Sequence, residues 1–279
     1  MRPIALNPLF LKLYDRVCAV TASSAPVLEH LSWVYDGCRL QRPAPAAVRL
    51  GLFGDEHHGY TVTVDGIPAA QEPTLLAALL YLDLEILRRP LFLNSPLLGF
   101  HASWIARGSR AVLLVGEGGC GKSSLCHQML SLGFEYGSEE VAAFSADGRL
   151  LPLPRRIMFK PDNPLIPQLG IRQDPRNLLA GFDGRFYVLP PGVSLASSGF
   201  YDCTFVFLHY QDDGPELEAL PLKTLDALQR LCGAAFRLQA MSSSLFAALV
   251  GSLSPERAVA VNYSSPGAAL AFLLKLADG

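Results

Sequence analysis

The sequence predicts an α/β fold in which a glycine-rich loop lies between a central strand and its helix. The apolar run from Ala111 to Val115 has the composition of a buried strand. It leads directly into the glycine-rich segment Gly116–Ser123. The pattern that follows is typical of a helix, and Gly133 is a natural C-terminal stop for it. We expect a mostly β core around this unit, over residues 96–279, and a small α/β lobe over residues 1–95.

The N-terminal lobe carries no recognisable chemical motif, but its residue patterns predict strands and helices. The adjacent His57 and His58 lie in a polar turn, where solvated histidines are more common than a metal site. We expect the lobe to serve substrate or partner binding. Its expected elements are a helix over Ala25–Val34, strands over Val48–Phe53 and Tyr60–Val64, and a helix over Glu72–Leu87 that Arg88, Arg89 and Pro90 end.

The segment before the loop has the pattern of a β-hairpin. Gly99–Ile105 is apolar, and Arg107-Gly108-Ser109 is typical of a turn into the strand that precedes the loop. If the hairpin is centred on Gly108, His101 lies opposite Val115. This register places His101 beside the mouth of the loop, where an imidazole can act in catalysis, although a single His in an apolar strand is usually a core residue.

The loop itself reads Gly-Glu-Gly-Gly-Cys-Gly-Lys-Ser and is complete. Glycines are needed because successive backbone N–H groups must turn towards the phosphates. Lys122 adds a positive charge, and the Ser123 hydroxyl is a ligand for Mg²⁺. The pattern therefore predicts a nucleoside triphosphate. The expected contacts are Gly116, Glu117, Gly118, Gly119, Cys120, Gly121, Lys122, Ser123 and Ser124.

An acidic pair is expected to return to this loop after the helix. A helix of about ten residues moves the chain roughly 15 Å away, and a strand over Phe134–Glu139 recovers about 20 Å. Adjacent carboxylates on a strand point to opposite faces. One of Glu139 and Glu140 could then orient Mg²⁺ while the other meets a substrate hydroxyl. The competing interpretation is a solvated acidic strand end.

The remaining chain is expected to close the core. Arg155, Arg156 and Lys160 follow a Leu-Pro-Leu-Pro segment, and an exposed edge strand is a more common place for such cations than a site that faces a nucleotide. The other expected elements are a strand over Cys203–Tyr210 and helices over Leu222–Leu231, Ser242–Val250 and Ala268–Leu276.

Composition argues against several classes of function. The net charge of −2 and the lack of a basic patch give no reason to expect a nucleic acid partner. No apolar run reaches the roughly 18 residues of a membrane span, so no membrane partner is expected. The N-terminus lacks a secretory pattern, and the 6 cysteines show no Cys-x-x-Cys spacing, so we expect reduced thiols and a cytoplasmic protein. The sequence leaves open whether the protein forms a homo-oligomer.

These residues resemble the HPr serine kinase family, in particular the HPr-kinase-related P-loop proteins of bacteria. Three features carry the resemblance: His101 fifteen residues before the first loop glycine, the loop Gly116–Ser123, and the acidic pair that begins seventeen residues after Lys122. Ordinary P-loop enzymes usually carry their metal-binding Asp on a more distant strand. The close spacing of the acidic pair to the loop therefore distinguishes this family from other P-loop enzymes. The similarity covers about Leu97 to Lys160.

The resemblance implies a P-loop kinase core of the HPr-kinase/PEP-carboxykinase-like type with a mixed β-sheet. It implies ATP and Mg²⁺, and transfer of the γ-phosphoryl group to a Ser or Thr hydroxyl of a peptide or small protein, with a ribosomally made peptide as one candidate. Glu139 would be the base or orient the nucleophile, and Ser123 and Glu140 would serve the metal. The implied catalytic residues are His101, Lys122, Glu139 and Arg185, the last as a second cation at the transition state.

Two departures from the family pattern limit what is carried over. The family pair is commonly Asp-Asp or Asp-Glu, and the extra methylene of Glu139 could displace a base by about 1 Å and slow transfer roughly a hundredfold. The glycine-rich signature tied to phosphorylase activity is not found, so a bifunctional enzyme is not expected. The alternatives are a kinase for a free small molecule such as an amino acid, and a non-catalytic nucleotide-binding regulator.

Overall fold

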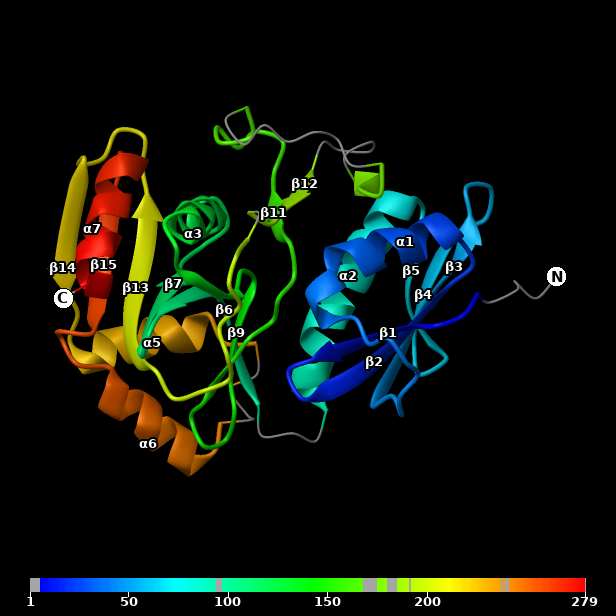
Figure 1. Cartoon of the computed structure of the whole chain (residues 1–279), viewed down its shortest axis with the longest axis horizontal. Helices are drawn as coiled ribbons and strands as arrows, with labels where there is room; N and C mark the ends of the chain where they lie inside the picture. Colours follow the sequence, from blue (N-terminus) through cyan, green and yellow to red (C-terminus); the bar gives the residue numbers. More distant parts are fainter. Residues whose placement is uncertain are drawn as a thin grey trace. The chain divides into compact units, whose positions relative to one another are not determined.

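The chain folds into mixed α/β structure, as predicted from the sequence (Figure 1). This computed structural model describes residues 6–93, 97–167, 175–179, 185–190, 192–236, 238 and 241–278, which form six α-helices and mixed sheets. Two compact units are present. Unit 1 comprises Met1–Ser95 and Met158–Val188, and unit 2 comprises Pro96–Ile157 and Leu189–Gly279. Among the described residues, none of the helices combines the length and hydropathy that a membrane crossing requires.

Unit 1 is built on a five-stranded sheet in the order β1-β2-β3-β4-β5, in which only β2 and β3 run parallel. The helix α1 connects these two strands, and α2 packs on β3, β4 and β5. Apolar residues alternate with polar ones along the strands, which buries one face of the sheet. The elements are β1 Leu9–Leu13, β2 Arg16–Ala22, α1 Ala25–Val34, η1 Asp36–Cys38, β3 Val48–Asp55, β4 Gly59–Val64, β5 Ile67–Glu72 and α2 Leu75–Phe92. A two-stranded sheet adds β11 Ile157–Phe159 and β12 Phe186–Val188.

The helix α2 differs from its predicted bounds at both ends. It begins at Leu75, because the Thr74 side chain accepts a hydrogen bond from the Ala77 N–H and caps the helix. It also continues through Pro90 to Phe92. Proline lacks an N–H and normally breaks a helix interior. Here it lies in the last turn, so the helix ends only two residues after it.

Unit 2 is built on a mixed sheet in the order β10-β9-β6-β7-β13-β15-β14, with β8 paired to β6. The strands β7, β13 and β15 are parallel, so their carboxyl ends lie at one edge, where the loop joins β7 to α3. The elements are β6 Leu98–Arg107, β7 Arg110–Val115, α3 Lys122–Ser131, β8 Glu135–Ser138, β9 Val141–Phe144, β10 Leu150–Leu151, β13 Asp202–Tyr210, β14 Leu217–Pro221, α5 Thr224–Gly233, α6 Ser243–Ser252, β15 Ala258–Tyr263 and α7 Pro266–Asp278.

Helices cover both faces of this sheet (Figure 1). Buried side chains of α5 and α6 form one hydrophobic cluster with the alternate residues of β6 and β7 that include Ala102 and Val115. The helices α3 and α7 pack against each other and against β6, β7 and β15 on the other face. The strand β7 is therefore buried from both sides, which accounts for its continuous apolar run.

The β6–β7 hairpin forms, but the predicted register is wrong by one residue. Ala102, not His101, lies opposite Val115, because the turn holds two residues between Arg107 and Arg110. Gly108 has a φ of +60°, as two-residue hairpin turns require. In the predicted register His101 would share the face of Val115 and point at the α5–α6 cluster. The observed register instead puts His101 on the face that α3 covers.

Candidate functional site

The loop geometry of unit 2 requires its glycines. Gly119 and Gly121 have φ values of +91° and +90°, which L side chains rarely adopt. A Cβ on Gly121 would lie 2.1 Å from the Tyr263 hydroxyl, and one on Gly116 would lie 2.7 Å from the Leu208 carbonyl oxygen. The backbone conformation therefore excludes larger residues at Gly119 and Gly121, and close packing excludes them at Gly116 and Gly121.

Lys122 is the first residue of α3 and is folded back over the loop. Its Nζ donates hydrogen bonds to the carbonyl oxygens of Gly116 (2.6 Å) and Glu117 (3.0 Å), and only 6 % of the residue is exposed. The first turn of α3 carries no acidic residue. The positive end of the helix is therefore not neutralised by its own side chains, which makes this end attractive to an anion.

The acidic pair lies in a bend between β8 and β9. The preceding strand ends at Ser138, one residue earlier than predicted. Both β8 and β9 pair antiparallel with β6, through Trp104 with Ser138 and His101 with Val141, so the bend lies beside the middle of β6. The Ser103 hydroxyl donates a hydrogen bond of 2.5 Å to the Glu139 carbonyl oxygen. This bond fixes the bend against the strand that carries His101.

Four predicted site residues meet at this bend. The Ser123 hydroxyl donates a hydrogen bond of 2.5 Å to Glu139 Oε1. His101 Nε2 lies 3.4 Å from Glu140 Oε1. Because Ser123 follows Lys122 in the first turn of α3, these contacts join the strand β6, the helix N-terminus and both carboxylates into one group.

The two carboxyl groups have different environments. Only 4 % of Glu139 is exposed, and burial together with the neighbouring Glu140 charge raises the pKa of Glu139, against the opposing effect of Arg155. Burial alone would raise the pKa of Glu140 as well, but the hydrogen bond from His101 and the Arg155 charge outweigh it and lower that pKa. Of the two carboxyls, Glu139 therefore takes up a proton more readily than Glu140.

Arg155 lies at the site, although the preferred interpretation of the sequence placed it on an exposed edge strand. That interpretation is wrong because only 2 % of the residue is exposed. Its Nη1 lies 3.8 Å from Glu139 Oε2, and its carbonyl oxygen accepts a hydrogen bond from the Tyr136 hydroxyl. The only signal in the sequence was an Arg directly after the apolar Leu-Pro-Leu-Pro segment.

The remaining predicted site residues lie partly in the loop and partly in unit 1. Glu117 and Cys120 lie in the loop, and burial raises the pKa of the Cys120 thiol more than the Lys122 charge lowers it, so this thiol is not activated. Arg185 belongs to unit 1, where its Nη1 lies 3.9 Å from the Met158 sulfur. It is therefore not among the groups that unit 2 brings together.

The donor set fits Mg²⁺ better than a transition metal. In the part of the chain that the structure describes, no group of three or more His, Cys, Asp or Glu side chains could hold a metal ion. Mg²⁺ sites at phosphates use only one or two protein ligands. Ser123 and Glu139 supply such a pair, and the buried Glu139 Oε2 has no hydrogen-bond donor among the described residues.

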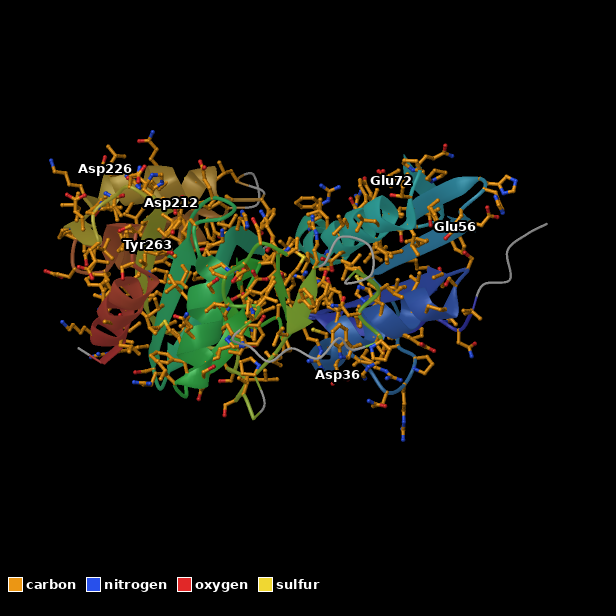
Figure 2. All side chains as sticks on the ribbon, turned by 90° about the horizontal axis from the view of Figure 1, so that it is seen from above. Asp36, Glu56, Glu72, Asp212, Asp226 and Tyr263 are labelled. Atoms are coloured by element: carbon orange, nitrogen blue, oxygen red, sulfur yellow. The ribbon has the colours of Figure 1, made fainter. Side chains whose placement is uncertain are left out.

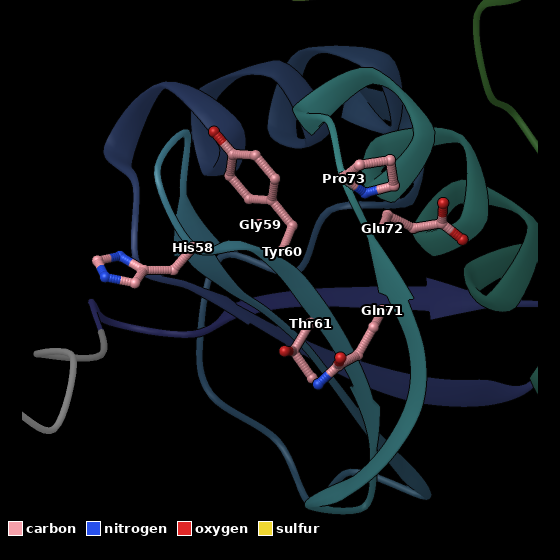
Figure 3. A pocket seen from close by; sticks show the side chains of 7 residues that line it. All are labelled: His58, Gly59, Tyr60, Thr61, Gln71, Glu72 and Pro73. Carbon is pink, nitrogen blue, oxygen red and sulfur yellow. The ribbon is translucent and has the colours of Figure 1, made fainter.

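The histidine pair of unit 1 belongs to a structural turn. Asp55 Oδ1 accepts hydrogen bonds from the N–H groups of His57 and His58, and the His58 ring lies 2.9 Å from the same oxygen. Figure 3 shows the shallow pocket beside this turn, with the His58 ring directed away from Tyr60 and Glu72. The pocket lining is His58, Gly59, Tyr60, Thr61, Gln71, Glu72 and Pro73.

Chemically, the group in unit 2 combines a helix N-terminus without acidic side chains in its first turn, a hydroxyl and carboxylate suited to a hard cation, and a second carboxylate in contact with an imidazole. These are the parts that phosphoryl transfer uses. No protein-family model matches the chain, and no curated protein matches it in sequence.

Proposed function

We propose that unit 2 is a P-loop kinase core that binds ATP with Mg²⁺ and transfers the γ-phosphoryl group to a Ser or Thr hydroxyl of a peptide or small protein. The observation that carries the proposal is the hydrogen bond from Ser123 to Glu139, with the His101–Glu140 contact beside it. A loop alone supports nucleotide binding. Two carboxylates next to the helix N-terminus support transfer as well.

Phosphoryl transfer needs alignment and neutralisation of charge more than covalent chemistry. The loop N–H groups and the N-terminus of α3 would hold the phosphates. Lys122 would leave the carbonyl oxygens of Gly116 and Glu117 and turn its ammonium group to the β- and γ-phosphates, as its flexible side chain permits.

The contacts favour a division of roles opposite to the one expected from the resemblance. Glu139 is buried and bonded to Ser123, so these two residues would hold Mg²⁺. The ion would offset the negative charge on the phosphates. The Glu140 side chain is 31 % exposed and lies against His101. Glu140 would therefore take the proton of the attacking hydroxyl while His101 orients its carboxylate.

The exposure of these side chains supports a peptide or protein acceptor. The His101 and Glu140 side chains are 38 % and 31 % exposed, so they are open to a group on a larger molecule. A small-molecule kinase would usually enclose its acceptor more completely. The hydroxyl oxygen would attack the γ-phosphorus, the bridging oxygen would leave with ADP, and the proton would pass to Glu140.

The test is to incubate the purified chain with Mg²⁺, γ-labelled ATP and a panel of Ser- and Thr-containing peptides. We expect label on the peptide hydroxyl with the wild-type chain, and loss of nucleotide affinity in Lys122→Ala. Label on free serine or threonine but not on peptides would favour the small-molecule kinase. Tight nucleotide binding without transfer to any acceptor would favour the regulator and contradict the kinase.

A further inference from the structure

The position of the carboxylates determines which way a triphosphate lies along the loop; this step rests on the proposed nucleotide binding. The metal and the terminal phosphates belong beside Ser123 and Glu139, which lie on the β6 side of β7. With the terminal phosphates on the β6 side, the nucleoside would extend towards the opposite side of β7. On that side the sheet continues with β13 and β15, whose carboxyl ends share the edge of the loop.

Two tyrosines end these two strands. Tyr210 is the last residue of β13, Tyr263 is the last residue of β15, and the two are partners in the strand register. Their rings are 5.4 Å apart in an edge-to-face arrangement. The Tyr263 hydroxyl donates a hydrogen bond of 2.7 Å to the Cys120 carbonyl oxygen. A continuous line of contacts therefore leads from the phosphate loop through Tyr263 to Tyr210.

The Tyr210 ring is held in place but is not covered. It is 38 % exposed, and its hydroxyl donates a hydrogen bond of 2.8 Å to Asp212 Oδ1. The segment after β13 is tied to the end of β15, because the Gln211 N–H donates to the Tyr263 carbonyl oxygen and the Ser264 N–H donates to that of Pro215. Figure 2 labels Asp212 and Tyr263 in this part of unit 2. The ring is therefore a fixed aromatic surface beside the loop.

We propose that the nucleotide base stacks on the Tyr210 ring. The neighbouring Asp212 carboxylate would repel a second phosphate, so the surface suits an uncharged base rather than another anion. Stacking uses the face of a base and tolerates its identity. Tyr210 would therefore distinguish a nucleotide from bare phosphate without selecting one base.

The experiment compares two ligands, ATP and inorganic tripolyphosphate, by calorimetry on the full-length chain with Mg²⁺. We expect Tyr210→Ala to weaken ATP binding by roughly 10- to 100-fold, as loss of one stacked base does, and to leave tripolyphosphate binding unchanged. Tyr210→Phe keeps the ring and should keep ATP affinity. The matched control is Phe200→Ala, which removes a 65 % exposed ring near the opposite, amino end of β13 and should alter neither affinity.

The outcomes separate the stacking proposal from the proposed function. Unchanged ATP affinity in Tyr210→Ala, or an equal loss for both ligands, overturns the stacking proposal while nucleotide binding stands. Failure of the wild-type chain to bind either ligand overturns both. A correct fold of the alanine variant is checked by its unchanged tripolyphosphate affinity and by the behaviour of Tyr210→Phe.

Discussion

Each unit buries a glutamate, and the two are paired in different ways. Glu85 of unit 1 is fully buried and bonded to Arg88 and Arg89, its neighbours one turn along α2. Glu139 of unit 2 is almost as buried, but its contacts are Ser123 and Arg155, each 16 positions away in the chain. The first pairing is local and satisfies both carboxylate oxygens. The second gathers groups from three segments and leaves one oxygen without a donor among the described residues.

This difference indicates which buried charge has a structural role. A carboxylate paired within one helix stabilises that helix, and its burial requires no ligand or metal ion. A buried carboxylate beside a like charge costs stability, and such arrangements cluster at functional sites. The following changes test whether the comparison holds, in order of expected effect.

The largest effect is expected when the two acidic residues of the bend are changed separately. Glu140→Gln removes the proton acceptor and should lower transfer at saturating Mg²⁺ by about 10²- to 10⁴-fold. Glu139→Gln removes a metal ligand, so transfer should recover as Mg²⁺ is raised. Titrating Mg²⁺ against the transfer rate measures both. Recovery of Glu140→Gln rather than Glu139→Gln at high Mg²⁺ would restore the roles expected from the resemblance.

The next effect is on stability and concerns Arg155. Arg155→Met removes the cation next to the buried Glu139 carboxyl, so it should lower the free energy of unfolding by about 3–5 kcal/mol at a pH where Glu139 is ionised, and by less where Glu139 is protonated. Arg155→Lys retains the charge and should recover part of this loss. Chemical denaturation of the chain without ligand measures both. Equal stability of wild type and Arg155→Met would show that the contact with Glu139 is not a stabilising pair.

A smaller effect is expected in unit 1 from Glu85→Ala. Arg88 and Arg89 keep 28 % and 33 % of their side chains in solvent, so they can be rehydrated when their partner is removed. We expect a loss of about 1–3 kcal/mol in the free energy of unfolding. Nucleotide affinity and transfer per folded molecule should not change. A large loss of transfer in this variant would remove the contrast between the two glutamates.

The smallest effect is expected from Gly66→Ala, in the turn between β4 and β5. Gly66 has a φ of +81°, but a Cβ there would meet no atom within 4 Å. The cost is therefore only that of the left-handed backbone, about 1–2 kcal/mol, without loss of nucleotide affinity. Gly121→Ala is the matched variant of the loop. It combines a similar φ with a clash at Tyr263 and should weaken nucleotide binding.

The sequence predicted the structural features that depend on the residue pattern of a short segment. The strand before the loop, the glycine positions and the helix after them follow from composition over a few residues. The register of the hairpin does not follow from local composition. A turn of two residues and a turn of three give registers that differ by one residue, and only packing against α5 and α6 selects one of the two.

Some contacts between distant segments were beyond sequence reasoning. Tyr263 lies 143 positions from Cys120, and β15, which carries it, was not predicted at all. The burial of Arg155 likewise depends on Tyr136 and Glu139, and edge-strand composition suggested the opposite. The proximity of Ser123 and Glu139 could be expected, since one helix and one strand return the chain to its starting point.

The most direct test of the account is a double-mutant cycle on Ser123 and Glu139, with Mg²⁺-dependent ATP binding as the measured quantity. If both residues hold one ion, the effects of Ser123→Ala and Glu139→Gln should be non-additive, with a coupling of about 0.5–3 kcal/mol that falls when Mg²⁺ is omitted to what their direct hydrogen bond contributes. Additive effects, or a coupling of the same size with and without Mg²⁺, would contradict a shared metal site between the loop and the acidic bend.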